Sequence, residues 1–358
     1  MIGAEAKINR SFECNQMVKP DDNLGADKIA LRVQLIAPTL GRFRKSVGAI
    51  NCTKSDAAKV DFLPSEVAAA IQESLSPATQ RAYADDLANF ERWGGGVPAN
   101  PAMVAAYLVH LAQDCRAATI ARRIAALSKA HRASGLDDPC KSEIVKATLR
   151  GIRRRIGTAQ REAKPLIRDD LFVVLHCIGD RPKDLRDKAL LLVGFAGAFR
   201  RSELIGLDVA DIEQVRQGIV VTLRRSKTDQ TGAGRKIGIP FGRTRWCPVR
   251  HLSDWLDNAR IDDGAVFRSV DRHGRIADQR LSSEAVSIIV KGRTEAAGFD
   301  PNAYSGHSLR AGLATSAAMA GASTWKIRAQ TGHASDAMLA RYIRDGSLFE
   351  HNAAGTVL

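Results

Sequence analysis

The C-terminal third of the sequence holds side chains whose types and order indicate a reaction. Tyr342 is preceded by His333, which lies in a Thr-Gly-His sequence, and by His307 and Arg310, which are three residues apart. A phenol can act as a nucleophile, an imidazole can carry a proton, and a guanidinium can stabilise charge that builds on phosphoryl oxygens. Together these residue types predict transesterification at a phosphodiester.

Three more charged residues lie upstream. Arg200 and Glu203 are three residues apart after an apolar run, so they share a helical face and the carboxylate can orient the guanidinium. Such pairs are also common on helix surfaces, which makes this pair weak evidence by itself. Lys227 follows a β-branched run in a polar segment. It is either a solvated charge or a lysine in a groove, which a nearby phosphate holds protonated and ready to give up its proton.

The two histidines have other interpretations. Either could be a hydrogen-bonded structural residue, although His307 and Arg310 begin an expected helix whose N-terminus attracts phosphate. A metal site is disfavoured, because neither an HxxxH pair nor a carboxylate-rich cluster accompanies His307 and His333. The sequence also contains no GxxxxGK[ST] loop. We therefore expect chemistry that uses neither a metal, nor ATP, nor another cofactor.

Composition limits the class of protein. The 358 residues suffice for two domains, and a hydrophobic content of 45% supports packed cores. The formal net charge of +14 indicates a polyanionic partner, although a merely basic protein would have the same charge. Six scattered cysteines without a CxxC pair are typical of free thiols in a reducing cytosol. There is no run of about 18 apolar residues, so no membrane span is expected. The expected location is the cytoplasm, in association with the nucleoid.

The elements that must position the reactive residues begin after Leu166. Two short runs at 218–223 and 235–240 predict a β-hairpin with a long polar tip that carries Lys227. Helices are expected around this hairpin, at 168–179, 183–197, 201–206, 249–259, 282–297, 307–320, 324–331 and 335–343.

A helical pattern precedes this part of the chain. Ser76-Pro77 and Asn100-Pro101 are typical helix starts, with a capping side chain followed by proline at the first helical position. Apolar residues then recur every three or four positions, as one face of a helix requires. We expect a bundle of four or five helices, with helices at 78–93, from 101 onward, at 118–134 and at 140–155.

Basic residues outnumber acidic ones in this bundle. Such charges are most often a solvated helix face, but so few interleaved acids favour contact with phosphates. The residues that we predict to bind DNA are Arg81, Arg122, Arg123, Lys129, Arg153 and Arg154.

Composition also predicts the domain organisation. Residues 1–60 show no convincing period and are expected to be a flexible N-terminal segment. Residues 61–157 form the helical unit, and the polar stretch 158–165, which ends in proline, is the expected linker. Residues 166–345 form the unit with the reactive side chains. Residues 346–358 are the C-terminal tail.

The combination resembles the tyrosine recombinase (phage integrase) family, from Ser76 to the C-terminus, and within it the Cre-like site-specific recombinases. The resemblance implies roles for seven residues: Arg200 as the first catalytic arginine, Glu203 as its supporting acid, Lys227 as the hairpin lysine, His307 and Arg310 as the HxxR box, His333 as the later His/Trp position, and Tyr342 as the nucleophile. His333 stands where Cre has tryptophan. The first 60 residues do not clearly match the arm-binding domain of lambda-type integrases.

The family implies a mainly α fold, with a helical core-binding (SAM-like) domain and a mixed α/β catalytic domain that contains a small β-hairpin sheet. It also implies that Tyr342 attacks the scissile phosphate and forms a 3′-phosphotyrosyl link with a free 5′-hydroxyl. His307 would accept the phenolic proton, and Lys227 would protonate the leaving oxygen. Arg200 and Arg310 would hold the non-bridging oxygens, while His333 would hydrogen-bond the phosphate.

The implied partners are double-stranded recombination sites, three further copies of the chain in a homotetramer on two sites, and accessory DNA-binding factors. No membrane is involved. The tail is either a frayed end or a segment that docks on a neighbouring protomer. The reaction would integrate, excise or resolve a mobile element or plasmid. Two other interpretations remain: a type IB topoisomerase, which relaxes supercoils by the same chemistry, and a basic DNA-binding regulator without catalysis.

Overall fold

The structure, a computed structural model, describes residues 66, 73–159, 162–224, 234–333, 335–337, 339–340 and 342. The predicted N-terminal segment 1–60, Lys227 and the tail 346–358 lie outside these residues. The described residues fall into two compact units, and the division between residues 160 and 161 lies inside the segment predicted as a linker. The expected fold class is confirmed, since the units are mostly helical with small antiparallel sheets. None of the described helices combines the length and apolarity that crossing a bilayer requires.

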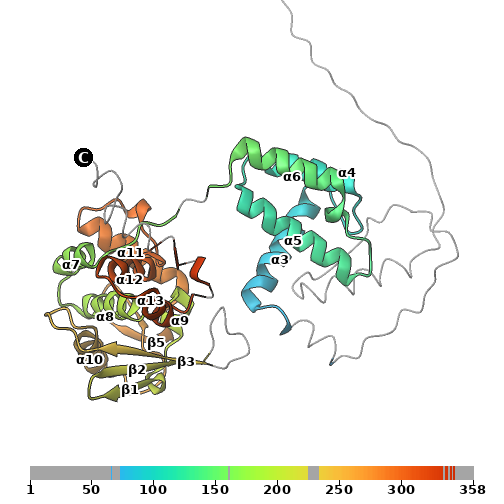
Figure 1. Cartoon of the computed structure of the whole chain (residues 1–358). Helices are drawn as coiled ribbons and strands as arrows, with labels where there is room; N and C mark the ends of the chain where they lie inside the picture. Colours follow the sequence, from blue (N-terminus) through green and yellow to red (C-terminus); the bar gives the residue numbers. More distant parts are fainter. Residues whose placement is uncertain are drawn as a thin grey trace, which may run out of the picture. The chain divides into compact units, whose positions relative to one another are not determined.

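The described part of the first unit is a helical bundle (Figure 1). The side chains of Ser76 and Asn100 accept hydrogen bonds from the third backbone N–H after them, so both predicted helix starts are confirmed. The core centres on Phe90, Tyr107 and Leu108, which are almost fully buried. The third helix packs on the first, and the fourth packs on the second. The α-helices of this unit whose bounds lie among its described residues are α3 (Pro77–Arg92), α4 (Pro101–Leu111), α5 (Ala117–Ala133) and α6 (Glu143–Ile156).

The last predicted helix of this bundle, at 140–155, is wrong at its start. A 3₁₀ turn (Pro139–Lys141) comes first, and α6 begins only at Glu143. Ser142 separates the two because its backbone is extended, with φ −64° and ψ 151°. Asp138 stabilises the turn by accepting the backbone N–H of Cys140 at 3.1 Å. A short polar side chain thus competes with the helix for backbone hydrogen bonds.

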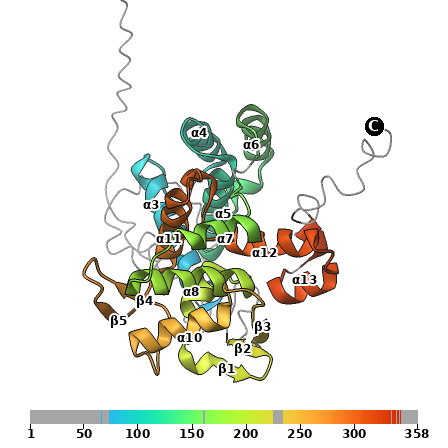
Figure 2. The same ribbon diagram turned by 90° about the vertical axis from the view of Figure 1, so that its left-hand side faces the viewer.

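The second unit is built around α8 (Pro182–Ala196). Residues 186–194 of this helix are all buried, and in both views it runs between the three-stranded sheet and α12 (Figure 1, Figure 2). The described residues of the helix predicted at 335–343 are helical at 336, 337, 339, 340 and 342. The other α-helices are α7 (Arg168–His176), α9 (Arg201–Gly206), α10 (Pro248–Ala259), α11 (Ser283–Ala296), α12 (Ser308–Met319) and α13 (Thr324–Thr331).

The sheets contain more strands than the sequence predicts. The expected hairpin is present as β2 (Gly218–Leu223) and β3 (Arg235–Pro240), and β1 (Ile212–Val215) adds a third antiparallel strand beside β2. A separate antiparallel pair consists of β4 (Arg268–Val270) and β5 (Ile276–Arg280). The strands that the sequence analysis missed are short and at most half-buried, so they lack the apolar alternation by which a strand is recognised.

Close backbone packing fixes the position of α12, which carries Arg310. The backbone N–H of Leu166 donates to the carbonyl oxygen of Ser308 at 2.9 Å. One turn later, a Cβ at Gly312 would lie 1.9 Å from the carbonyl oxygen of Leu166. The segment before α7 therefore lies directly on the first turns of α12. Only glycine leaves room for that approach.

This contact predicts the effect of a single methyl group. Gly312→Ala should lower the free energy of unfolding by about 2 kcal/mol, because the opposing atoms are backbone and cannot rotate away. Gly292 in α11 is the matched control, since a Cβ there meets no atom within 4 Å. Gly292→Ala should stabilise by up to about 1 kcal/mol. Chemical denaturation measures both, and equal stability of the two variants would contradict the close approach.

Candidate active site

The fold brings Tyr342 and His307 into contact across 35 residues of sequence. The Tyr342 hydroxyl lies 2.7 Å from Nε2 of His307, and the tyrosine is 9% exposed. Its ring packs with Ala311, Ala314 and Leu339, a small cluster that joins α12 to the described residues after α13. His307 itself is exposed and immediately precedes α12. A phenol and an imidazole at hydrogen-bond distance form the arrangement that a nucleophile and its proton acceptor require.

Arg310 is the most deeply buried charged group of the site, at 1% exposure. Its Nη1 donates to the carbonyl oxygen of Ala198 at 2.8 Å, whereas its Nη2 has no hydrogen-bond partner in the described part of the chain. Burial, and then the neighbouring charge of Arg200, lower the pKa of Arg310 to about 10. It still carries its charge at neutral pH. A buried guanidinium with an unused donor is costly unless an anion completes it.

Arg200 and Glu203 interact as the sequence analysis expects. The carboxylate of Glu203 accepts hydrogen bonds from Nη1 of Arg200 at 2.6 Å and from the backbone N–H of the same residue at 2.9 Å. Arg200 is the N-cap residue of α9, and Glu203 is 5% exposed. Two hydrogen bonds to one carboxylate fix both the backbone and the guanidinium. Nη2 of Arg200 also reaches the carbonyl oxygen of Gly332 at 3.5 Å.

His333 lies beside Tyr342, and their ring centroids are 5.6 Å apart. The histidine is 6% exposed, and its Nδ1 is 2.8 Å from Oγ1 of Thr331. Burial, followed by the positive charges of Arg310 and Arg200, lowers the pKa of His333 to about 4. The imidazole is therefore neutral at physiological pH. Among the described residues, no group of three His, Cys, Asp or Glu side chains could hold a metal ion.

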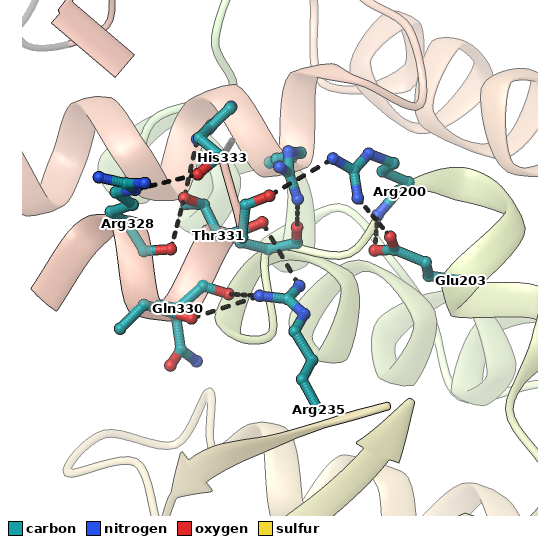
Figure 3. Close-up of polar contacts among 11 residues, drawn as sticks. Arg200, Glu203, Arg235, Arg328, Gln330, Thr331 and His333 are labelled. Carbon is teal, nitrogen blue, oxygen red and sulfur yellow. Dashed lines mark hydrogen bonds and ion pairs between the residues drawn. The ribbon is translucent and has the colours of Figure 1, made fainter. Parts of the chain in front are cut away.

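Arg235, the first residue of β3, is a part of the site that the sequence analysis missed. Its guanidinium points at the C-terminal end of α13 (Figure 3). Nη1 donates to the carbonyl oxygens of Ala329 and Gln330 at 3.3 Å, and Nη2 donates to that of Thr331 at 3.4 Å. The last carbonyls of a helix have no partner within it. Arg235 supplies these missing donors and thereby holds the segment that leads to His333.

Further contacts fix the same end of α13. The side-chain amide of Gln330 donates to the carbonyl oxygens of Ala196 at 2.8 Å and Gly238 at 3.1 Å. Gly332 has a φ of 64°, and a Cβ there would lie 2.3 Å from Nη1 of Arg235. The glycine of the Thr-Gly-His sequence is thus needed both for its left-handed conformation and for the approach of the arginine.

The residues predicted to bind DNA all lie in the first unit. Arg81, Arg153 and Arg154 are exposed, and Lys129 is half-buried. Arg122 is exposed but also lies 2.8 Å from a carboxylate oxygen of Asp86. Arg123 is only 17% exposed, and its Nη1 donates at 2.6 Å to the side chain of Asn89 inside the bundle. The guanidinium of Arg123 is therefore engaged in holding helices together.

Comparison with known proteins identifies the family. The model of the phage integrase family matches residues 167–347, and that of the phage integrase N-terminal SAM-like domain matches residues 69–134. The chain belongs to the phage integrase family. An integrase/recombinase XerD homolog of Selenomonas ruminantium is 38% identical, over 79% of this chain and 86% of its own. Recombinase Cre of Escherichia phage P1 is 29% identical, over 72% of this chain and 78% of its own.

The fold is also found among solved structures. A lambda integrase tetramer bound to a Holliday junction matches with a TM-score of 0.53 and 19% identity, over 76% of this chain and 73% of that one. The resemblance predicted from the sequence is thus confirmed, and the protein is a tyrosine-type site-specific recombinase. The match at 167–347 contains every described residue of the candidate site. Lys227 also falls within that match, but outside the described residues.

The contacts of Arg235 predict that DNA cleavage depends on the geometry of this guanidinium as well as on its charge. Arg235→Met removes all three carbonyl contacts, so the segment that carries His333 should shift and DNA cleavage at saturating DNA should slow by about 10²-fold. Arg235→Lys keeps the charge but loses the planar fork, and should recover only part of the rate. Lys236 on the same strand is exposed, so Lys236→Met is the control. Wild-type cleavage by Arg235→Met would contradict this role.

The low pKa of His333 predicts a pH dependence of stability. In the unfolded chain this imidazole takes up a proton below about pH 6.5, but in the folded recombinase only below about pH 4. Between these values the unfolded state binds more protons, so acidification destabilises the fold, by up to about 3 kcal/mol. Denaturation of wild type and His333→Gln across this range measures the effect. The variant should lose less stability, and identical slopes would contradict the assignment.

Proposed function

We propose that Tyr342 is the nucleophile with which this recombinase cuts and rejoins DNA. The observation that carries the proposal is the 2.7 Å contact between the Tyr342 hydroxyl and Nε2 of His307, beside the buried guanidinium of Arg310. A tyrosine hydroxyl ordinarily has a pKa of about 10, so it needs a proton acceptor at neutral pH. His307 is in place to accept that proton.

In the cleavage step, the phenolic oxygen of Tyr342 attacks the scissile phosphorus as its proton passes to Nε2 of His307. The bond from phosphorus to the 5′-oxygen breaks, and a 3′-phosphotyrosyl link forms. The leaving 5′-oxygen takes a proton, for which we propose Lys227 as the donor. The number of phosphoester bonds is unchanged, because one is made as another is broken. The 5′-hydroxyl of a partner strand can therefore reverse the step without ATP.

The guanidiniums stabilise the charge that builds on the non-bridging oxygens. The unused Nη2 of Arg310 supports this role, since an oxyanion would complete its hydrogen bonding. Arg200 is oriented in advance by Glu203, so little reorganisation is needed in the transition state. Losing one such donor typically costs about 10²–10³-fold in rate. The ring centroid of His333 lies 5.6 Å from that of Tyr342, and in this proposal His333 reaches the same phosphate.

Strand exchange requires partners beyond one chain. We propose that the recombinase binds two double-stranded recombination sites as a homotetramer, and the lambda integrase tetramer on a Holliday junction, which has a similar fold, supports this. Among the basic residues of the first unit, those that would contact DNA are Arg81, Arg122, Lys129, Arg153 and Arg154. We also propose that the recombinase associates with the nucleoid and works with accessory DNA-binding factors. Its reaction would integrate, excise or resolve a mobile element or plasmid.

A covalent trapping experiment tests the nucleophile. Duplexes from the DNA that flanks the gene are nicked near candidate sites, so that the 5′-hydroxyl fragment diffuses away and the phosphotyrosyl adduct accumulates. Wild type should form an adduct that resists denaturation, and Tyr342→Phe should form none, because it keeps the ring packing and loses only the hydroxyl.

The matched control is Tyr304→Phe. Tyr304 is also buried, at 2% exposure, and its hydroxyl has no hydrogen-bond partner in the described part of the chain. Removing that hydroxyl should leave the adduct unchanged. An adduct that persists in Tyr342→Phe, or one that disappears only in Tyr304→Phe, would overturn the proposed nucleophile.

A further inference from the structure

The last residue of α13, Thr331, makes two short contacts through its hydroxyl. Its Oγ1 lies 2.8 Å from the carbonyl oxygen of Ile327, one turn earlier, and 2.8 Å from Nδ1 of His333. Thr331 is completely buried. Water is therefore not available to replace either contact.

A hydroxyl has a single hydrogen, so only one arrangement makes both contacts hydrogen bonds. The carbonyl oxygen of Ile327 can only accept, and the hydroxyl must therefore donate to it. Oγ1 of Thr331 is then an acceptor toward His333, and Nδ1 must carry a proton. If the hydroxyl donated to Nδ1 instead, two acceptor oxygens would face each other at 2.8 Å without a hydrogen between them.

We propose that Thr331 is a positioning residue that holds His333 in the tautomer with its proton on Nδ1, which leaves Nε2 as the nitrogen that exchanges protons with the active site. The other ring nitrogen, Nε2, has no hydrogen-bond partner among the residues that the structure describes. Burial, and then the neighbouring cations Arg310 and Arg200, keep the ring neutral. It therefore carries one proton, and Thr331 decides which nitrogen holds it.

The residues around Thr331 restrict the position of its hydroxyl. Thr331 is β-branched, and such a side chain has few rotamers in a helix. The carbonyl oxygen of Thr331 accepts a hydrogen bond from Nη2 of Arg235 at 3.4 Å. Hydrogen bonds therefore restrain both the backbone and the side chain of Thr331. Figure 3 shows Thr331 between Arg235 and His333. The position of the imidazole is thus determined through one residue that is held at two points.

The consequence rests on the proposed function. Before DNA binds, Nε2 of His333 presents a lone pair and cannot donate to a phosphoryl oxygen. When the negative phosphate enters and offsets the nearby guanidiniums, Nε2 takes up a proton from the buffered solvent, and the N–H that forms donates a hydrogen bond to a phosphoryl oxygen. His333 thus begins as a proton acceptor and becomes a donor only in the complex, with Nδ1 bonded to Thr331 throughout.

Nuclear magnetic resonance of the full-length protein with ¹⁵N-labelled histidine tests the tautomer directly. The His333 signals are assigned by their loss in His333→Gln. Wild type and Thr331→Ser, which keeps the hydroxyl, should both show protonated Nδ1 and unprotonated Nε2. Thr331→Val has nearly the same shape but no acceptor, and its proton should move to Nε2 or distribute between the nitrogens. A wild-type ring protonated on Nε2 overturns the proposal, whether or not any variant folds.

The rate of adduct formation is the second measurement. Thr331→Val should slow it by about tenfold at saturating DNA, the effect of losing about 1.4 kcal/mol, and Thr331→Ser should restore it. A Thr331→Val protein with the wild-type tautomer and rate overturns the positioning role. If wild type shows the expected tautomer but never forms an adduct, the proposed nucleophile fails while the Thr331–His333 pair stands.

Discussion

Repulsion among buried positive charges is the constraint on which this structure depends. Burial lowers the pKa of the Arg235 and Arg310 guanidiniums, and the positive charge of Arg200 lowers both further. Holding these charges together inside the protein costs free energy that solvent does not offset. Glu203 offsets part of it by its hydrogen bonds to Arg200. Backbone carbonyl oxygens accept further hydrogen bonds from all three guanidiniums. An entering anion would complete the arrangement, and in the proposed function a phosphodiester brings that charge.

This constraint explains why the supporting elements pack so closely. A backbone carbonyl oxygen can fix the position of a guanidinium by hydrogen bonding only if that backbone is itself held in place. The carbonyl for Arg310 comes from Ala198, whose φ of 49° is uncommon for a residue with a Cβ. The carbonyl oxygens that accept from Arg235 come from the end of α13, and the guanidinium lies so close to Gly332 that no side chain would fit at that position. Gly312 likewise lets Leu166 lie on the helix that carries Arg310. Stability and charge positioning are therefore properties of the same contacts.

The sequence predicted what depends on local chemistry. Helix starts such as Asn100-Pro101 are set within a few residues, so they were found, as were the helices of the second unit. The helix break at Ser142 and the strands β1, β4 and β5 were missed, because short polar segments fit several structures equally well. Arg235 could not be recognised, since an arginine on a strand is ordinarily solvated. Its partners lie 94 to 96 residues further along the chain, and no local pattern records such a distance.

The two histidines have identical side chains, but their different environments suit them to different roles. His307 is exposed at a helix start and presents Nε2 to the phenol of Tyr342, where a proton can leave toward solvent. His333 is buried near cations, and its Nδ1 contacts Thr331, so in the proposed function its protonation would depend on the group that enters the site. An imidazole that contacts water can turn over protons in every cycle. A buried one responds mainly to the charge of the bound group, so in the proposed function the hydrogen bonding of His333 would depend on the arrival of phosphate.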